Sequence, residues 1–400
     1  MAGPLHGFRV LDLSAVVSGP LTGALLADQG ADVIKVERTG AGDIQRHVGS
    51  KRNGFSGFFH VLNRGKRSLA VDLGSTEGVD IVRRLARDAD VVIQNFRPGV
   101  VDRLGIGYSV LSADNPGLVY LSISGFGQTG PRARERAYDP IIQCYSGMAD
   151  VQGRIHPEHP DRPEQVNMLL LDKLTAATGC QAVTAALLAR SKSGQGQHIE
   201  LSMLDTAIAF AWSDVAADLI LQGDGVEQRP PVGASGTVFE FRDGWGATMT
   251  LSQGEFEGMC RVFGAEDIAA DPRFASLEAR MGHRDELREV LADRLAQAAA
   301  GLGIEEAGAR LAAEQVPFAR VRRLAELHDD AQVQHNEMFR DIDHPVAGRL
   351  REARPAPRFS ATPAQAGAPA PTVGQHTREI LEECGFGDQL EDYLRRGIVS

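Results

Sequence analysis

The stretch LHGFRVLDLSAVVSGPLTGALLADQGADVIKVE, residues 5–37, decides the fold class. Phe8–Leu13 and Asp32–Glu37 are apolar runs of strand length. Between them, Leu21–Asp28 is a predicted helix that follows the breaker Ser18-Gly19-Pro20. A strand, a helix and a second strand in this order form the crossover unit of parallel sheets. The opening of the chain therefore predicts an α/β fold.

The same alternation continues over the first half of the chain. Further predicted strands are Ser68–Asp72, Val91–Gln94, Leu118–Ser124 and His198–Ser202, and further predicted helices are Glu77–Arg87, Leu174–Arg190 and Leu204–Leu221. This alternation is typical of a large Rossmann-like parallel sheet with helices on both faces. We expect a ligand at the carboxyl ends of its strands.

The composition and pattern of the sequence change after Gln222. Residues 223–236 are rich in Gly and Pro and read as a linker. Strands Thr237–Arg242 and Trp245–Leu251, joined by Asp243-Gly244, form a predicted β-hairpin. Helical segments near Glu255–Phe263 and Arg284–Ala300 then complete a smaller domain. The Pro-rich stretch Arg354–Pro371 is predicted to be an extended strap, and Thr377–Cys384 a short helix.

Composition bounds the class of protein. The 400 residues include 42 Lys and Arg against 53 Asp and Glu, so the formal net charge is −11. This balance argues against binding nucleic acid or anionic membranes through bulk charge. No signal peptide and no run of about 18 apolar residues is evident. The four dispersed cysteines fit reduced thiols, so we expect a cytoplasmic protein.

Signatures of nicotinamide, ATP and zinc chemistry are missing. Gly40-Ala41-Gly42 lacks the third glycine of a dinucleotide fingerprint, and Gly65-Lys66-Arg67 is only a fragment of a P-loop. His156 and His159 lie in a Pro-rich turn, which is more typical of a solvated loop than of a metal site. We expect no metal and no permanently bound cofactor.

Basic residues gather in one segment of this acidic chain. Residues 35–67 contain eight Lys and Arg and two acids, a local charge of +6. A solvated loop surface is one interpretation, and a site for a polyanionic small molecule is the other. Arg38 follows a strand, and Arg97 and Arg103 flank a turn after another strand, where guanidinium groups can bind phosphates. An apolar rim of Val16, Val71 and Phe96 suits an adenine and a pantetheine arm.

One aspartate stands between an apolar run and a long helix. Asp172 follows Met168–Leu171 directly and precedes the predicted helix Leu174–Arg190. It could be the N-cap of that helix, because Asp is a favoured cap residue. It could also be a nucleophile, because a helix N-terminus stabilises a carboxylate as the anion. The two interpretations are compatible.

Several long motifs resemble those of one enzyme family, in the same order. They are LHGFRVLDLSAVVSGP (Leu5–Pro20), GADVIKVERTGAGD (Gly30–Asp43), NRGKRSLAVDL (Asn63–Leu73), QNFRPGVVDRLGIGY (Gln94–Tyr108), NPGLVYLSISGFGQTGP (Asn115–Pro131) and SGQGQHIELSMLD (Ser193–Asp205). With these motifs the chain resembles the class III CoA-transferases of the CaiB/BaiF type, which include formyl-CoA transferase, carnitine CoA-transferase and the α-methylacyl-CoA racemases.

The resemblance implies an architecture. Such proteins have a large α/β domain built from both chain ends and a smaller α+β domain, and two chains form interlocked rings. We therefore expect residues 1–222 to form the N-terminal part of the large CoA-binding domain and 223–236 a linker. Residues 237–320 would form the small domain, and 321–400 a return strap with the C-terminal part of the large domain. The expected assembly is a homodimer.

The resemblance also implies chemistry. The family's nucleophilic aspartate falls on Asp172, and the substrates are an acyl-CoA and a free carboxylic acid. The implied CoA contacts are Val17, Ser18, Arg38, Val71, Asp72, Leu73, Gly74, Asn95, Phe96, Arg97, Arg103 and Arg136. Val17 replaces a glutamine beside the acyl group of formyl-CoA transferase, which argues against oxalate or formate. Ser252-Gln253-Gly254 corresponds to that enzyme's glycine-rich lid.

The pair Tyr138-Asp139 bears on the reaction type. The racemases of the family place a His, used as acid and base, before this Asp, whereas tyrosine with an ordinary pKa near 10 is a poor base at neutral pH. The pair therefore favours CoA transfer, with Tyr138 holding a carbonyl or a carboxylate. The alternatives are a racemase-like enzyme, or a CoA-binding protein without catalysis.

Overall fold

The computed structural model describes residues 3–153, 162–226 and 237–400. His156, His159 and most of the expected linker 223–236 lie outside the described residues. The chain divides into two compact units, which are treated separately below. Unit 1 contains Met1–Phe210 and Gln332–Ser400, and unit 2 contains Ala211–Ala331.

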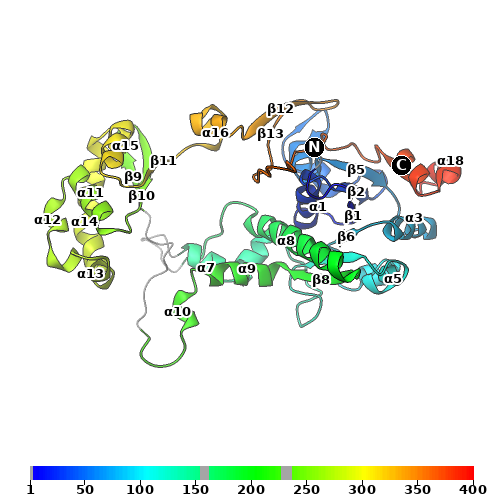
Figure 1. Ribbon diagram of the computed structural model, residues 1–400, viewed down its shortest axis with the longest axis horizontal. Coiled ribbons are helices and arrows are strands. Elements are labelled where there is room, and N and C mark those ends of the chain that lie inside the picture. Colours follow the sequence, from blue (N-terminus) through cyan, green and yellow to red (C-terminus); the bar gives the residue numbers. More distant parts are fainter. Residues whose placement is uncertain (1–2, 154–161, 227–236) are drawn as a thin grey trace. The chain divides into compact units, whose positions relative to one another are not determined.

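A six-stranded parallel sheet forms the centre of unit 1 (Figure 1). Its strands are β1 (Arg9–Asp12), β2 (Asp32–Glu37), β5 (Lys66–Ala70), β6 (Val91–Gln94), β7 (Val119–Ser124) and β8 (Gln197–Ser202). They lie side by side in the order β5-β2-β1-β6-β7-β8. The parallel sheet predicted from the alternating pattern is thus confirmed. This order, running outward in both directions from the first strand, is that of the doubly wound nucleotide-binding folds.

Helices cover both faces of the sheet. One core packs α1 (Ser18–Asp28), α6 (Asp139–Tyr145), α8 (Leu170–Ser193) and α9 (Met203–Trp212) against the strands. The opposite core contains α3 (Thr76–Arg87), α5 (Tyr108–Asp114), α17 (Thr377–Glu383) and α18 (Leu390–Arg395). Central strands such as β6 and β7 are buried along their whole length, as a sheet covered on both faces requires.

Shorter elements complete unit 1. They are β3 (Lys51–Arg52), β4 (Phe55–Ser56), α2 (Gly57–Asn63), α4 (Val100–Leu104), α7 (Met148–Gly153), α16 (Ala331–His335), β12 (Phe339–His344) and β13 (Gly348–Ala353). The Pro-rich stretch Arg354–Pro371 has neither helix nor strand, as predicted. Among the described residues, no helix is long and apolar enough to cross a membrane.

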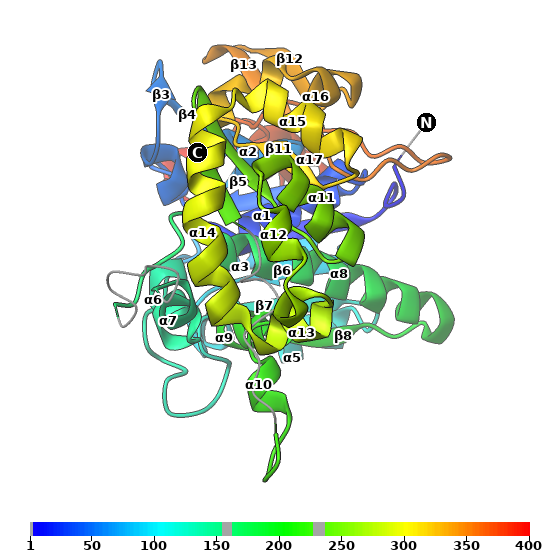
Figure 2. The same ribbon diagram turned by 90° about the vertical axis from the view of Figure 1, so that its left-hand side faces the viewer.

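Unit 2 packs helices against a small antiparallel sheet (Figure 2). The sheet has the order β11 (Phe318–Arg320), β10 (Gly244–Thr248), β9 (Thr237–Phe241). The predicted hairpin is confirmed, with Gly244 opposite Phe241. The helices are α11 (Gln253–Phe263), α12 (Glu266–Ala269), α13 (Leu277–Gly282), α14 (Arg284–Gly301) and α15 (Ile304–Ala313), and the short α10 (Ala217–Ile220) precedes the sheet.

The segment expected to match a glycine-rich lid is the start of α11. Ser252 caps this helix, because its Oγ accepts the N–H of Glu255 at 3.2 Å, and Glu255 Oε2 accepts the N–H of Ser252 at 2.9 Å. Gln253 and Gly254 are the first helical residues. The reciprocal capping box therefore places the segment in a regular helix and not in a loop.

Two helices begin earlier than the sequence predicts. Ser18-Gly19-Pro20 was expected as a breaker, but it is the first turn of α1, where a proline needs no N–H partner. The helix predicted over Leu174–Arg190 begins at Leu170. Conversely, the helix predicted over Leu204–Leu221 ends at Trp212, with α10 after it.

Candidate active site

A pocket of about 420 Å³ opens where the strand order reverses, between the loops that follow β1 and β6. In a doubly wound sheet this switch point is where ligands bind. The loop after β1 contributes Val16, Val17 and Ser18, and the loop after β6 contributes Asn95–Pro98. The remaining wall consists of Ile123, Ser124, Gly125, Ala133, Glu135, Arg136, Ala137, Tyr138, Asp172 and Met203.

Hydrogen bonds hold the turn after β1 in a strained shape. Val16 has a φ of 70°, a left-handed conformation that is rare for a β-branched residue. The side chain of Asn95 binds both polar groups of Ala15: its Oδ1 accepts the N–H at 2.8 Å and its Nδ2 donates to the carbonyl at 2.6 Å. Asn95 was expected to contact CoA, but here both ends of its amide hold this turn.

Buried ion pairs lie directly beneath the same turn. Lys66 Nζ is 2.8 Å from Asp12 Oδ2, and Lys35 Nζ is 2.9 Å from Asp43 Oδ2. Both pairs are almost completely buried. Lys35 also donates to the carbonyl of Ser14, and burial lowers the pKa of Lys66 to about 8. These charges support the loop from inside the fold and are not available to a ligand.

Most of the positive charge in segment 35–67 is therefore neutralised by ion pairs. The segment as a whole is not free to bind a polyanion. Five of its eight cations form ion pairs: Lys35, Arg46, Arg64, Lys66 and Arg67, with Asp43, Glu37, Asp28, Asp12 and Asp32. Arg38, which follows β2, is exposed, and its Nε donates to the carbonyl of Gly42 at 3.0 Å. Among the described residues no carboxylate pairs with it.

Asp172 is the third residue of α8 and not its N-cap. The cap position is Leu169, which offers no side-chain hydrogen bond. The acceptor comes from another helix: Asp139 Oδ2 accepts the backbone N–H of Asp172 at 2.8 Å. This outside partner allows α8 to begin two residues before Asp172, so the expectation that Asp172 caps the helix was wrong.

The environment of the Asp172 carboxyl group makes it unusually basic. Burial raises its pKa to about 6, with a further contribution from the negative charge of Asp139. The backbone N–H and the hydroxyl of Ser18 hydrogen-bond to the carboxylate and oppose this rise. Ser18 was expected to contact CoA, and the structure adds this contact with Asp172. A carboxylate with a pKa of about 6 is ionised at neutral pH, which is the form that a nucleophilic aspartate needs.

The pocket brings together eight of the fourteen residues expected at the site. They are Val17, Ser18, Asn95, Phe96, Arg97, Arg136, Tyr138 and Asp172. Tyr138 precedes α6 and its side chain is exposed. Arg38, Val71–Gly74 and Arg103 lie outside the pocket wall, after β2, after β5 and in α4 respectively. Val71 is buried, whereas Asp72 is exposed and its Oδ1 accepts the N–H of Gly74 at 2.9 Å.

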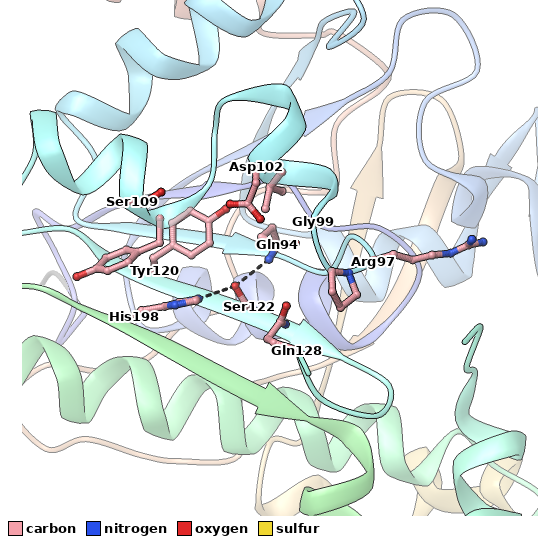
Figure 3. Close-up of a pocket in the computed structure, with 12 residues that line it drawn as sticks. Gln94, Arg97, Gly99, Asp102, Ser109, Tyr120, Ser122, Gln128 and His198 are labelled. Atoms are coloured by element: carbon pink, nitrogen blue, oxygen red, sulfur yellow. Dashed lines mark hydrogen bonds between the residues drawn. The ribbon is translucent and has the colours of Figure 1, made fainter. Parts of the chain in front are cut away.

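A smaller cavity of about 210 Å³ adjoins the loop after β6 (Figure 3). Ser122 Oγ lies 2.8 Å from His198 Nε2 and also 2.8 Å from Gln94 Nε2, a contact pair drawn as dashed lines in Figure 3. Gln94 Oε1 in turn accepts the N–H of Phe96 at 2.8 Å. This series of hydrogen bonds therefore supports the Asn95–Pro98 loop from the side of the smaller cavity. Arg97 lines both cavities and points away from His198.

No metal site is apparent in the part of the chain that the structure describes. No group of three or more His, Cys, Asp or Glu side chains could hold a metal ion there.

Comparison with known proteins assigns the chain to a family. The family model described as CoA-transferase family III matches residues 5–377. The chain belongs to this family, as its motifs predicted. It is an enzyme of the CoA-transferase class.

Individual relatives match this chain over nearly its whole length. A succinyl-CoA:glutarate CoA-transferase of Mus musculus is 32% identical over 99% of this chain and 90% of that protein. A succinate–glutarate CoA-transferase of Agrobacterium fabrum is 33% identical over 95% of both chains. The crystal structure of a CaiB/BaiF family protein from Brucella suis has a TM-score of 0.79 and 30% identity, covering 96% of this chain and 100% of that one.

Sequence reasoning missed two groups that hold the start of α8, where Asp172 lies. Asp139 was noted only as the neighbour of Tyr138, and Gln143, one turn later in α6, was not noted. The dipeptide Asp139-Pro140 does signal a helix start. It could not show that Asp139 faces the start of another helix.

Proposed function

We propose that this enzyme transfers CoA from an acyl-CoA to a free carboxylic acid through covalent intermediates on Asp172. The observation that carries the proposal is the buried Asp172 carboxylate in the wall of the switch-point pocket, held by Ser18. A buried, ionised carboxylate with a raised pKa is suited to attack a thioester carbonyl.

The reaction proceeds in four balanced steps. A carboxylate oxygen of Asp172 attacks the donor thioester, the C–S bond breaks, and a mixed anhydride and CoA thiolate form. The thiolate attacks the aspartyl carbonyl and releases the donor acid, which leaves an aspartyl-CoA thioester. The acceptor carboxylate attacks this thioester and expels the thiolate. The thiolate then takes the new acyl group and regenerates Asp172.

The pocket supports these steps in two ways. Both intermediates are open to hydrolysis, and burial of Asp172 limits the access of water. The acyl carbonyl or the substrate carboxylate lies against Tyr138, whose hydroxyl can donate to either. No step changes the oxidation state of an atom, and none needs a further reactant.

The acids are proposed to be dicarboxylic. The relatives of Mus musculus and Agrobacterium fabrum are named for succinate and glutarate. Arg97 and Arg136 line the same pocket as Asp172, and neither pairs with a carboxylate among the described residues. A guanidinium group in the wall can bind the second carboxylate of such an acid. A panel of mono- and dicarboxylic acids, read by mass spectrometry, tests this choice.

CoA itself is proposed to lie along the carboxyl ends of β1, β2, β5 and β6. Its phosphates meet Arg38 and Arg103, and its adenine and pantetheine meet Val71–Gly74, Phe96 and the turn at Val17. Arg38 and Arg103 support this placement because both are exposed and unpaired with carboxylates among the described residues.

Replacement of Asp172 by Asn tests the nucleophile. The amide keeps the shape of the side chain and removes its charge, so transfer should fall at least roughly a thousandfold, about 4 kcal/mol of transition-state stabilisation. Asp205→Asn is the matched control, because Asp205 is also the third residue of its helix and lies outside the pocket. A folded Asp172→Asn enzyme with wild-type turnover would refute the mechanism. Exchange of an α-proton with solvent, without transfer, would identify a racemase.

The enzyme is further proposed to be a homodimer of interlocked chains. Strand β8 lies at an edge of the sheet, and the exposed side chains of Leu188 on α8 and Ile208 on α9 offer apolar surface in unit 1. Interlocked chains must partly unfold before they separate. Sedimentation at nanomolar concentration should therefore still show a dimer, and a monomer would contradict the interlocking.

A further inference from the structure

Asp139 is completely buried at the start of α6, next to the backbone of Asp172. Each of its carboxylate oxygens accepts one N–H group. Oδ2 accepts the backbone N–H of Asp172 at 2.8 Å, and Oδ1 accepts Nε2 of Gln143 at 2.5 Å. Both oxygens of this buried carboxylate therefore have a hydrogen-bond donor.

Gln143 connects this carboxylate to the chain that leads into α8. Its Oε1 accepts the N–H of Val166 at 2.8 Å, and its Nε2 lies 3.2 Å from the carbonyl oxygen of Met168. Gln143 is buried as well. Asp139 and Gln143 together therefore hold residues 166–172 at several points.

We propose that Asp139 is a positioning residue for the nucleophile: it fixes the first turn of α8 through the N–H of Asp172 and places its own carboxylate beside that of Asp172. This inference rests on the proposed function of Asp172. It assigns no contact between Asp139 and the substrate.

Other charged or titratable groups line the same pocket as Asp172 or lie beside it in the chain. They are Arg97 after β6 and Glu135, Arg136 and Tyr138 before α6, with Lys173 as its neighbour in α8. Ser18 of α1 hydrogen-bonds to it without a charge of its own. Burial raises the pKa of Asp172, and Asp139 supplies the main charge contribution in the same direction. Removal of this charge should therefore lower that pKa towards the ordinary value of an aspartate.

The test is the pH dependence of kcat/KM for the donor acyl-CoA, because its acid limb reports ionisation of the free enzyme. In wild type the limb should lie near pH 6. In Asp139→Asn it should move to lower pH. The rate at pH 8 should fall roughly ten- to a hundredfold, because a hydrogen bond to a charged group is lost and the amide opposes Gln143.

A second variant separates positioning from folding. In Asp139→Asn/Gln143→Glu, the amide of residue 139 can donate to the new carboxylate and still accept the N–H of Asp172. Part of the lost rate should return, with the acid limb still below that of wild type because the charge lies farther away. Asp114→Asn, which removes an exposed surface carboxylate paired with Arg87, is the control and should match wild type.

The outcomes distinguish this inference from the proposed function. A wild-type acid limb in folded Asp139→Asn, with or without a loss of rate, overturns the inference alone. If that variant does not fold, a wild-type limb in the double variant overturns it equally. Hydroxylamine trapping of the wild type with donor acyl-CoA should give a hydroxamate on Asp172. Its absence overturns the proposed function and the inference with it.

Discussion

The carboxyl group of Asp172 combines burial with a nearby negative charge, and both disfavour its ionisation. The surrounding protein therefore makes the ionised form of Asp172 less stable than it would be in water. The hydrogen bonds from the Ser18 N–H and hydroxyl offset part of this cost. The left-handed backbone of Val16, in the same pocket wall, is strained and also lowers the stability of the folded protein. Functional sites commonly destabilise a protein locally, and the rest of the fold is stable enough to tolerate this.

Asp172→Asn should therefore stabilise the folded protein at neutral pH. The folded-state pKa of about 6 lies above the ordinary 3.8, so the wild type loses stability as the pH rises from about 4 to 6. The amide has no such loss. The gain should reach about 2 to 3 kcal/mol above pH 6 and disappear towards pH 4. Urea unfolding of both proteins at pH 4.5 and pH 7.5 measures it, and a gain that does not grow with pH would contradict the raised pKa.

At the scale of elements, the sequence predicted the sheet well because buried parallel strands leave continuous apolar runs, as in Val91–Gln94. Helix starts were predicted less well. The start of α8 depends on Asp139, 33 residues earlier in the chain, and no local pattern contains that contact. Likewise, the positive charge of segment 35–67 can be counted in the sequence. The ion pairs that its cations form with Asp12, Asp28 and Asp32 can be seen only in the folded protein.

This pairing sharpens the prediction for CoA binding. Arg38→Ala and Arg103→Ala should each weaken CoA binding by about 1.5 to 3 kcal/mol, the contribution of a hydrogen bond to a charged group. Lys51→Ala is the matched control, because Lys51 is an exposed cation of the same segment outside the expected site, and it should leave the affinity unchanged. Calorimetric titration measures all three. Wild-type affinity in both arginine variants would contradict the phosphate assignment.

At the scale of the whole molecule, the two ends of the chain meet in unit 1. Val399 forms a bridge with Val71, the carbonyl of Ile398 accepts the N–H of Asp72 at 2.8 Å, and Ile398 lies in the core that contains α3. The resemblance to the family implied that residues 321–400 return to the large domain. The pattern of the residues themselves predicted only a short helix near the C-terminus, since the pairing of residues more than 300 apart has no local periodicity. The C-terminal residues thus support the Val71–Gly74 segment that is proposed to bind CoA.

Ile398→Ala should consequently affect both stability and binding. Loss of a buried isoleucine side chain costs about 2 to 5 kcal/mol. CoA affinity should fall as well, because the backbone at Asp72 loses its support. Leu394→Ala, on the exposed side of α18, is the control and should cost much less. Denaturant unfolding and calorimetry provide the two readings, and an unchanged free energy of unfolding in Ile398→Ala would contradict the placement of the C-terminus.

Transfer of oxygen from the acceptor acid to Asp172 tests the central claim most directly. In the proposed steps, one carboxylate oxygen of the acceptor remains on Asp172 when the thiolate takes the acyl group. The wild type, after turnover with succinyl-CoA and an acceptor acid labelled with ¹⁸O in its carboxylates, should therefore gain at least about 2 Da on the proteolytic peptide that contains Asp172, whereas the peptide that contains Asp205 should gain nothing. An active enzyme whose Asp172 peptide stays unlabelled would contradict covalent catalysis by Asp172.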